Sequence, residues 1–323
     1  MRPRFAADYR TLLWVFFAAA LVAIEFVRPE LAKYLFWLNA YLALACGVIA
    51  HNHNHCPTFA GKRANQVFAI AISTFYGYPV FAWIPTHNLN HHKYVNRAGD
   101  ATITWRFTNK HNLWVAATYF FVSSYYQGYP IREFIKKARE TNRPLYARIL
   151  TQYAFWIGSH VALLALALVL HGLTQGLLLY VLSLGIPAFF ALWTIMLFNY
   201  EQHVHTDPWS RHDHSRSWDG KLVNFLLFNN GLHAAHHENP GTHWSKLPEL
   251  HAELAPKIDP RLIEHNMWWY FARQYFVAPF FPKLGSVQVG RAGFEPPDGK
   301  LEVVTSAEVE LGEAGTNASM VGT

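Results

Sequence analysis

The sequence predicts an all-α integral membrane protein, with four transmembrane helices in two hairpins and a helical cap on the cytoplasmic side. Three observations lead to this fold class. Hydrophobic residues make up 52% of the 323 residues and charged residues only 15%, against about 25% charged in a typical soluble domain. Four stretches are long and apolar enough to cross a bilayer. The chain also has 19 histidines, many of them just past these stretches.

The four apolar stretches are expected to pair as two helical hairpins. They cover residues 11–27, 31–50, 149–170 and 173–198, close to the roughly 20 residues that a transmembrane helix needs. Arg28-Pro29-Glu30 is a very short link within the first pair, and His171-Gly172 is a similar link within the second. The first stretch also resembles a secretory signal. The second apolar stretch follows almost at once, however, which favours a hairpin.

Basic residues near the helix ends predict which side of the membrane each end faces. Arg2, Arg4 and Arg10 precede the first stretch, and six Lys and Arg residues between positions 132 and 148 precede the third. Positively charged flanks stay in the cytoplasm. Both termini and a cap formed by residues 51–148 and 199–283 are therefore expected there. The net charge of +6 then reflects membrane orientation, and no nucleic-acid partner is expected.

The last 40 residues differ in composition from the rest. Residues 284–323 contain few aromatics and six acidic side chains, a composition typical of a flexible segment. The sequence therefore predicts one membrane domain over residues 1–283 and a flexible acidic tail over 284–323.

Nine histidines form clusters whose spacing indicates metal binding. Residues three or four apart share one face of a helix, so His51 and His55 can point at one site, as can His87 with His91 and His233 with His237. Adjacent histidines on a helix diverge by about 100°. The adjacent pairs therefore suggest two ions side by side. The nine are His51, His55, His87, His91, His92, His203, His233, His236 and His237.

The ligand chemistry narrows the kind of metal site. Imidazole suits zinc, copper, iron and nickel, and nine imidazoles are too many for one ion. A structural zinc site would be closed by four ligands, often cysteines, but the chain has only Cys46 and Cys56. Open positions on redox-active iron would suit oxygen chemistry. The Glu-x-x-His pairs of soluble di-iron bundles and the His-Glu-x-x-His motif of metalloproteases are both absent from the sequence.

The remaining histidines are interpreted as ordinary hydrogen-bonded residues, with His205 the strongest exception. His53 belongs with them because it lies about 200° around a helix from His51. The others are His111, His160, His171, His212, His214, His243, His251 and His265.

The histidine pattern resembles that of the membrane fatty acid desaturase family, whose members carry three histidine boxes. The boxes here are His51-x-x-x-His55, His87-x-x-x-His91-His92 and His233-x-x-His236-His237, and the family's further ligand segment matches Asn199-x-x-x-His203. The flank Pro240-Gly241-Thr242-His243-Trp244 also looks like bacterial members. The similarity extends over roughly residues 30 to 275.

The resemblance implies a cofactor, partners and a location. Two iron ions would be held by the nine histidines, with Asn199 acting through a bound water, and O2 would be the co-substrate. The substrate would be a fatty acid or lipid. Electrons would come from an external ferredoxin-like or haem protein, and the basic residues 132–143 would receive it or else contact anionic lipid headgroups. The protein would lie in a bacterial inner membrane, with its site on the cytoplasmic side.

Metal geometry then constrains two ambiguous segments. His55 and His87 must meet, so residues 67–85 cannot cross the membrane completely, and residues 113–126 stay on the cytoplasmic face.

Other functions remain open at this stage. The same irons would serve a fatty acid desaturase, an acyl or alkane hydroxylase, a carotenoid ketolase or an alkene-forming decarboxylase. A metal transporter would need ionisable ligands at mid-membrane depth, whereas the histidines here follow the helix ends. An inactive structural relative is a further alternative.

Overall fold

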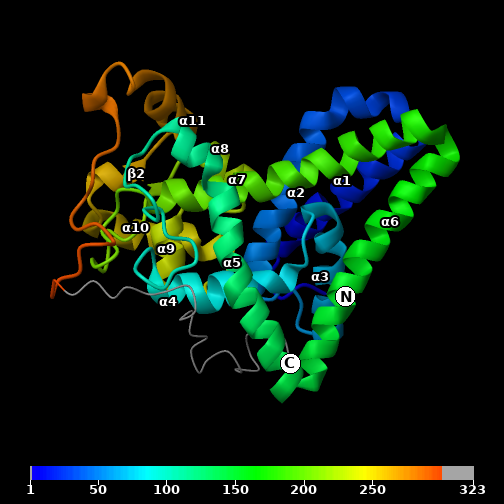
Figure 1. The fold of residues 1–323 in the computed structure, drawn as a ribbon, viewed down its shortest axis with the longest axis horizontal. Helices are drawn as coiled ribbons and strands as arrows, with labels where there is room; N and C mark the ends of the chain where they lie inside the picture. Colours follow the sequence, from blue (N-terminus) through cyan, green and yellow to red (C-terminus); the bar gives the residue numbers. More distant parts are fainter. Residues whose placement is uncertain (1, 300–323) are drawn as a thin grey trace. The chain divides into compact units, whose positions relative to one another are not determined.

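The computed structural model describes residues 2–299 and consists of two compact units (Figure 1). Unit 1 contains residues 2–84 and 134–195, and unit 2 contains residues 85–133 and 196–299. The chain is mostly helical, which confirms that part of the predicted fold class. A pair of two-residue strands in unit 2 is an exception to the all-α expectation.

The helices and strands follow in chain order. The α-helices are α1 Asp8–Val27, α2 Ala32–His55, α3 Lys62–Tyr76, α4 His92–Tyr94, α5 Leu113–Thr141, α6 Arg143–Tyr180, α7 Ile186–His203, α8 Lys221–Leu226, α9 His233–Glu238, α10 Leu247–Leu254 and α11 Met267–Ala272. A π-helical segment covers Ile84–His91 and another covers Val181–Gly185. Strands β1 Ser217–Trp218 and β2 Ile263–Glu264 pair in parallel, Ser217 opposite Ile263.

In unit 1, α1 and α2 form a helical hairpin. The turn between them is short, as predicted, because Pro29 opens a single 3₁₀ turn that leads directly into α2. A buried hydrogen bond from the Asn39 amide to the Glu25 carboxyl, 2.7 Å long, joins the two helices. Val22, Phe26 and other apolar side chains pack in a core that includes Ala167 and Leu179 of α6.

The second hairpin of unit 1 reverses at Gly172. Its backbone has φ +75° and ψ 177°, which is not helical, so α6 is two arms joined at this residue. The arms approach closely beyond the turn, since a side chain on Gly176 would meet the Ala167 carbonyl oxygen at 2.4 Å. The predicted link at His171-Gly172 is therefore confirmed. In Figure 1 the first arm of α6 runs to this turn and the chain then returns toward α7.

Helix α3 ends early, and the chain bends sharply after it. Gly77 caps α3 in the left-handed region, and the helical segments on either side of this break meet at 96°. The 15 residues of α3 span about 22 Å, less than the roughly 30 Å of a bilayer core.

Three described stretches are long and apolar enough to cross a membrane. They are Asp8–Val27, Pro29–His55 and Arg143–His203, and a fourth is counted if the bent pair around Gly77 is one span. The 61 residues of the third stretch include the reversal at Gly172, so this stretch supplies two arms rather than one.

Unit 2 has a small apolar core in which the segment after residue 284 takes part. Val289 is buried with Leu232, Leu254 and Leu262, and its N–H donates to the His205 carbonyl. The flexible tail expected from residue 284 therefore does not begin there, because a few apolar side chains secure this segment. Residues 300–323, the rest of the expected tail, lie outside the described residues.

Candidate metal centre

Four histidines of unit 2 converge on one point. His91 ends the π-helical segment, His203 ends α7, and His233 and His237 lie one turn apart on α9. The Nε2 atom of His203 lies 3.0 Å from that of His91 and 2.9 Å from that of His233. The Nε2 atom of His237 lies 3.1 Å from that of His233 and 3.3 Å from that of His91. We call this set the four-histidine group.

The hydrogen bonds around the group show that its donor atoms suit a metal ion. The outer nitrogen of His91, Nδ1, lies 2.8 Å from an Asp100 carboxylate oxygen, and Nδ1 of His203 lies 3.1 Å from the His214 carbonyl. Both partners only accept, so in neutral rings both Nδ1 atoms carry the proton. The two Nε2 atoms then face each other with lone pairs, an arrangement that a cation between them would stabilise.

The environment of His237 favours the neutral form that binds metal. Burial, together with the neighbouring imidazoles of His92, His233, His203 and His91, keeps the pKa of His237 well below its ordinary value. Protonated imidazole cannot be a ligand, so this environment keeps the ring available for a cation.

Asp100 is a candidate functional residue that sequence reasoning missed. Burial alone would raise its pKa, but His91, Thr102 and the Asn96 N–H lower that pKa to about 2. The Thr102 hydroxyl donates to Oδ1 at 2.7 Å and the Asn96 N–H to Oδ2 at 2.8 Å. Asp100 is thus a fixed anion behind His91. The loop that follows the second box contains this one acid, which is a weak signal without the fold.

Three further histidines of unit 2 form a second cluster beside the first. The Nε2 atom of His92 lies 3.1 Å from that of His87 and 3.0 Å from that of His236, and the last two are 3.4 Å apart. We call this set the three-histidine cluster. As predicted, each adjacent pair splits: His91 and His237 belong to one set, His92 and His236 to the other.

One detail of the spacing argument was wrong. His87 and His91 were expected to point at one site, but their Nε2 atoms have different partners. Their rings stack nearly parallel, with centroids 5.1 Å apart and planes at 19°. The His87 Nε2 atom lies near those of His92 and His236, whereas the His91 Nε2 atom lies near those of His203 and His237.

In unit 1, the last turn of α2 carries His51 and His55 on one face. Their ring centroids are 4.9 Å apart, as the four-residue spacing predicts. His53 lies on another face, where its Nδ1 is 3.0 Å from the Thr58 hydroxyl. The Trp83 ring packs against His51 with centroids 5.1 Å apart, so an aromatic side chain borders this pair.

Asn199 is buried and its amide donates to the Tyr119 hydroxyl at 2.9 Å. That hydroxyl in turn donates to the Thr102 carbonyl. Asn199 is therefore connected to the loop that holds Asp100. Its expected role, through a bound water, stays a prediction.

A buried polar network lies next to the four-histidine group along α7. The Glu201 carboxylate, two residues before His203, is 3.0 Å from His111 Nε2 and accepts a 2.8 Å hydrogen bond from the Tyr270 hydroxyl. The Tyr275 hydroxyl donates to its other oxygen. This network fixes the end of α7. It accounts for His111, which the sequence analysis had interpreted as an ordinary hydrogen-bonded residue.

Of three comparisons with known proteins, one gives a match. A family model described as fatty acid desaturase matches residues 29–284, a range that contains all nine clustered histidines. Neither a curated protein nor a solved structure gives a significant match.

Proposed function

The chain belongs to the fatty acid desaturase family, and on that premise we propose that it is an O2-dependent desaturase with two iron ions. It would insert a double bond into the acyl chain of a fatty acid or lipid. The four-histidine group carries this proposal. Its inward nitrogen lone pairs converge within 4.8 Å of one another, and imidazole is a ligand suited to redox-active iron.

His51, His55 and the three-histidine cluster would hold the second iron, as the three boxes of the family imply. Asn199 would act through a water molecule. The support for this part is the pattern of three boxes and the separation of each adjacent histidine pair into two sets.

The irons, when bound and reduced, supply the activation of O2 that removes hydrogen from an unactivated C–H bond. The overall reaction converts a CH2–CH2 unit, O2, two electrons and two protons into an alkene and two waters. The residues of this chain contribute positioning. Asp100 keeps the His91 ring in one tautomer and orientation, and apolar side chains must hold the alkyl chain because saturated carbon offers no hydrogen bond.

The helices are placed in the membrane as two hairpins. Helices α1 and α2 form the first, and the two arms that meet at Gly172 form the second. Helix α3 is too short to cross and stays near the cytoplasmic face. Both termini and the metal centre face the cytoplasm of a bacterium, as the basic flanks indicate.

An external ferredoxin-like or haem protein supplies the two electrons. Its docking surface includes the basic end of α5, where Arg132, Lys136 and Arg139 lie on one helix. An acidic partner would be attracted to this surface, and its association would weaken as ionic strength rises.

Product analysis separates desaturation from the related reactions. We expect membranes of a host that expresses the protein to contain acyl chains lighter by two hydrogens, measured by mass spectrometry. The control is the same host with the His91→Ala variant. Products heavier by one oxygen would assign a hydroxylase or a ketolase instead, and loss of the carboxyl carbon would assign a decarboxylase.

A further inference from the structure

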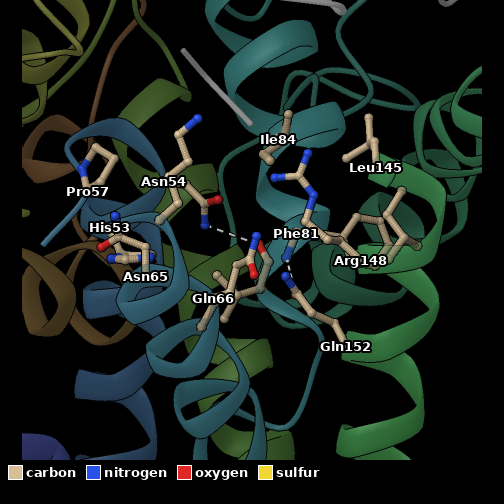
Figure 2. A pocket seen from close by; sticks show the side chains of 14 residues that line it. His53, Asn54, Pro57, Asn65, Gln66, Phe81, Ile84, Leu145, Arg148 and Gln152 are labelled. Carbon is tan, nitrogen blue, oxygen red and sulfur yellow. Dashed lines mark hydrogen bonds between the residues drawn. The ribbon is translucent and has the colours of Figure 1, made fainter. Parts of the chain in front are cut away.

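A pocket lined by both polar and apolar side chains lies in unit 1. The last turn of α2, the first turns of α3 and α6, and the segment around Phe81 surround it (Figure 2). Figure 2 shows His53, Asn54 and Asn65 on one side and Arg148 and Gln152 on the other. The remaining lining residues are Pro57, Lys62, Gln66, Ala69, Val80, Phe81, Ile84, Leu145 and Ile149.

The charges of this pocket favour an anion. Lys62 and Arg148 bring two positive charges, and no carboxylate is among the fourteen described residues that line it. Lys62 is exposed and Arg148 half-buried. An Arg guanidinium binds a phosphate through two parallel hydrogen bonds, whereas a Lys ammonium acts as a mobile point charge. Arg148 would therefore orient the anion, and Lys62 would add electrostatic attraction.

Side-chain amides supply uncharged polar groups to the pocket. The Asn54 amide donates to the carbonyls of Ala50 and Val80. The Asn65 side chain accepts from the Phe59 N–H and donates to the Phe59 carbonyl. These hydrogen bonds fix the backbone around the pocket. Gln152 accepts a 3.0 Å hydrogen bond from the Phe81 N–H through its oxygen. Its NH2 group then remains as a donor, the kind of group that a phosphate oxygen requires.

The position along the helices indicates where the anion would come from. The pocket lies at the end of α2 and the beginning of α6, both of which belong to stretches apolar enough to cross a membrane. On the membrane placement proposed above, this is the depth of the cytoplasmic headgroups, where basic pockets between helices bind anionic lipids. On α2 it occupies the side of His53, whereas His51 and His55 lie on another face.

We propose that this pocket is a binding site for a phosphate ester, held by Lys62 and Arg148 with the amide of Gln152. The phosphate belongs either to an anionic phospholipid headgroup or to a soluble compound. None of the nine clustered histidines lines this pocket. The assignment of the phosphate to a lipid headgroup rests on the proposed membrane placement.

The test is a binding titration on the full-length, iron-loaded protein in detergent. One arm adds short-chain phosphatidic acid, a second adds the matching diacylglycerol without phosphate, and a third adds inorganic phosphate. The readout is the thermal unfolding temperature together with native mass spectrometry. We expect saturable binding of phosphatidic acid and none of diacylglycerol. An equal response to inorganic phosphate would assign the soluble source.

Variants connect the binding to the pocket. Lys62→Gln and Arg148→Gln should each weaken the phosphate ligand about fivefold, the effect of one cation near an anionic surface. Arg63→Gln is the matched control, because Arg63 is exposed beside Lys62 but does not line the pocket. If Arg148→Gln fails to fold, the Lys62→Gln variant at an exposed position and the conservative Arg148→Lys variant test the binding site instead.

Two results would overturn the proposal. One is the absence of saturable binding in the phosphate arms, and the other is an equal loss in Arg63→Gln. The titration does not measure turnover, so it can succeed where desaturation fails, and the iron content of each variant shows separately whether the metal centre is intact.

Discussion

The ring of His91 depends on the carboxylate behind it. Asp100 is fully buried, accepts four hydrogen bonds from Thr102, Asn96 and His91, and has a pKa lowered to about 2. Such an anion fixes the ligand tautomer and makes the inner nitrogen more basic. Asp100 would therefore act on a bound metal through His91, without touching it.

Replacing Asp100 should weaken the metal centre without removing a ligand. We expect Asp100→Ala to lower iron affinity or activity about 10- to 100-fold, the usual effect of losing such a partner. Iron titration and product yield measure it. Asp298→Ala, at an exposed position, is the control. Equal behaviour of the two variants would show that the carboxylate does not support His91.

Alanine substitution of a proposed ligand should affect activity and iron content far more than substitution of another histidine. We expect His91→Ala and His236→Ala, one from each set in unit 2, to abolish activity and lower the iron content. His265 bonds Asp219 and its side chain is 84% exposed, so His265→Ala should change neither. Full activity of both cluster variants would exclude the assignment.

At this scale the sequence predicted part of the histidine geometry, and the differences have clear causes. The four-residue spacing placed His233 and His237 together, because α9 is an ordinary helix. The same rule was wrong for His87 and His91, whose stacked rings reach different partners. Asp100 was missed because its contact with His91 depends on how the loop folds back, which no local spacing reports.

At the scale of elements, two glycines set the turns of unit 1. Gly172 reverses α6 at the predicted link. The link could be predicted because a long apolar stretch lies on each side of it. Gly77 ends α3 in a left-handed conformation, within the apolar stretch 67–85. Glycine is favoured at both because a side chain is strained there.

A side chain at Gly77 should destabilise unit 1. A Cβ atom there would lie 2.4 Å from the Ala188 Cβ and its φ is +88°, so strain and overpacking combine to about 2 kcal/mol or more. We expect Gly77→Ala to lower the thermal unfolding temperature in detergent. Gly158→Ala, a helical position with nothing within 4 Å, should leave it unchanged or raise it. The opposite order would contradict the packing described.

The end of the domain was harder to predict at this scale. Composition alone marked residues 284–323 as an acidic tail. The packed part of that segment depends on a few contacts, such as Val289 in the core and the Trp209 indole N–H donating to the Ala292 carbonyl. Amino-acid composition averaged over a segment does not reveal single side chains that anchor it to a core.

At the scale of the whole molecule, the proposed sidedness rests on the basic residues near the helix ends and is directly testable. In a chain whose Cys46 and Cys56 are replaced by alanine, single cysteines at Thr174 and Thr141 report the two sides. We expect a membrane-impermeant maleimide to label Thr174→Cys in intact spheroplasts and Thr141→Cys only after lysis. Labelling in the reverse order would invert the proposed topology.

The central claim is that the nine clustered histidines hold two irons. Its most direct test is the iron content of purified, fully loaded protein, measured by mass spectrometry of the metal and by quantitative amino-acid analysis of the chain. The account predicts two iron ions per polypeptide. A plateau at one ion or fewer would contradict it.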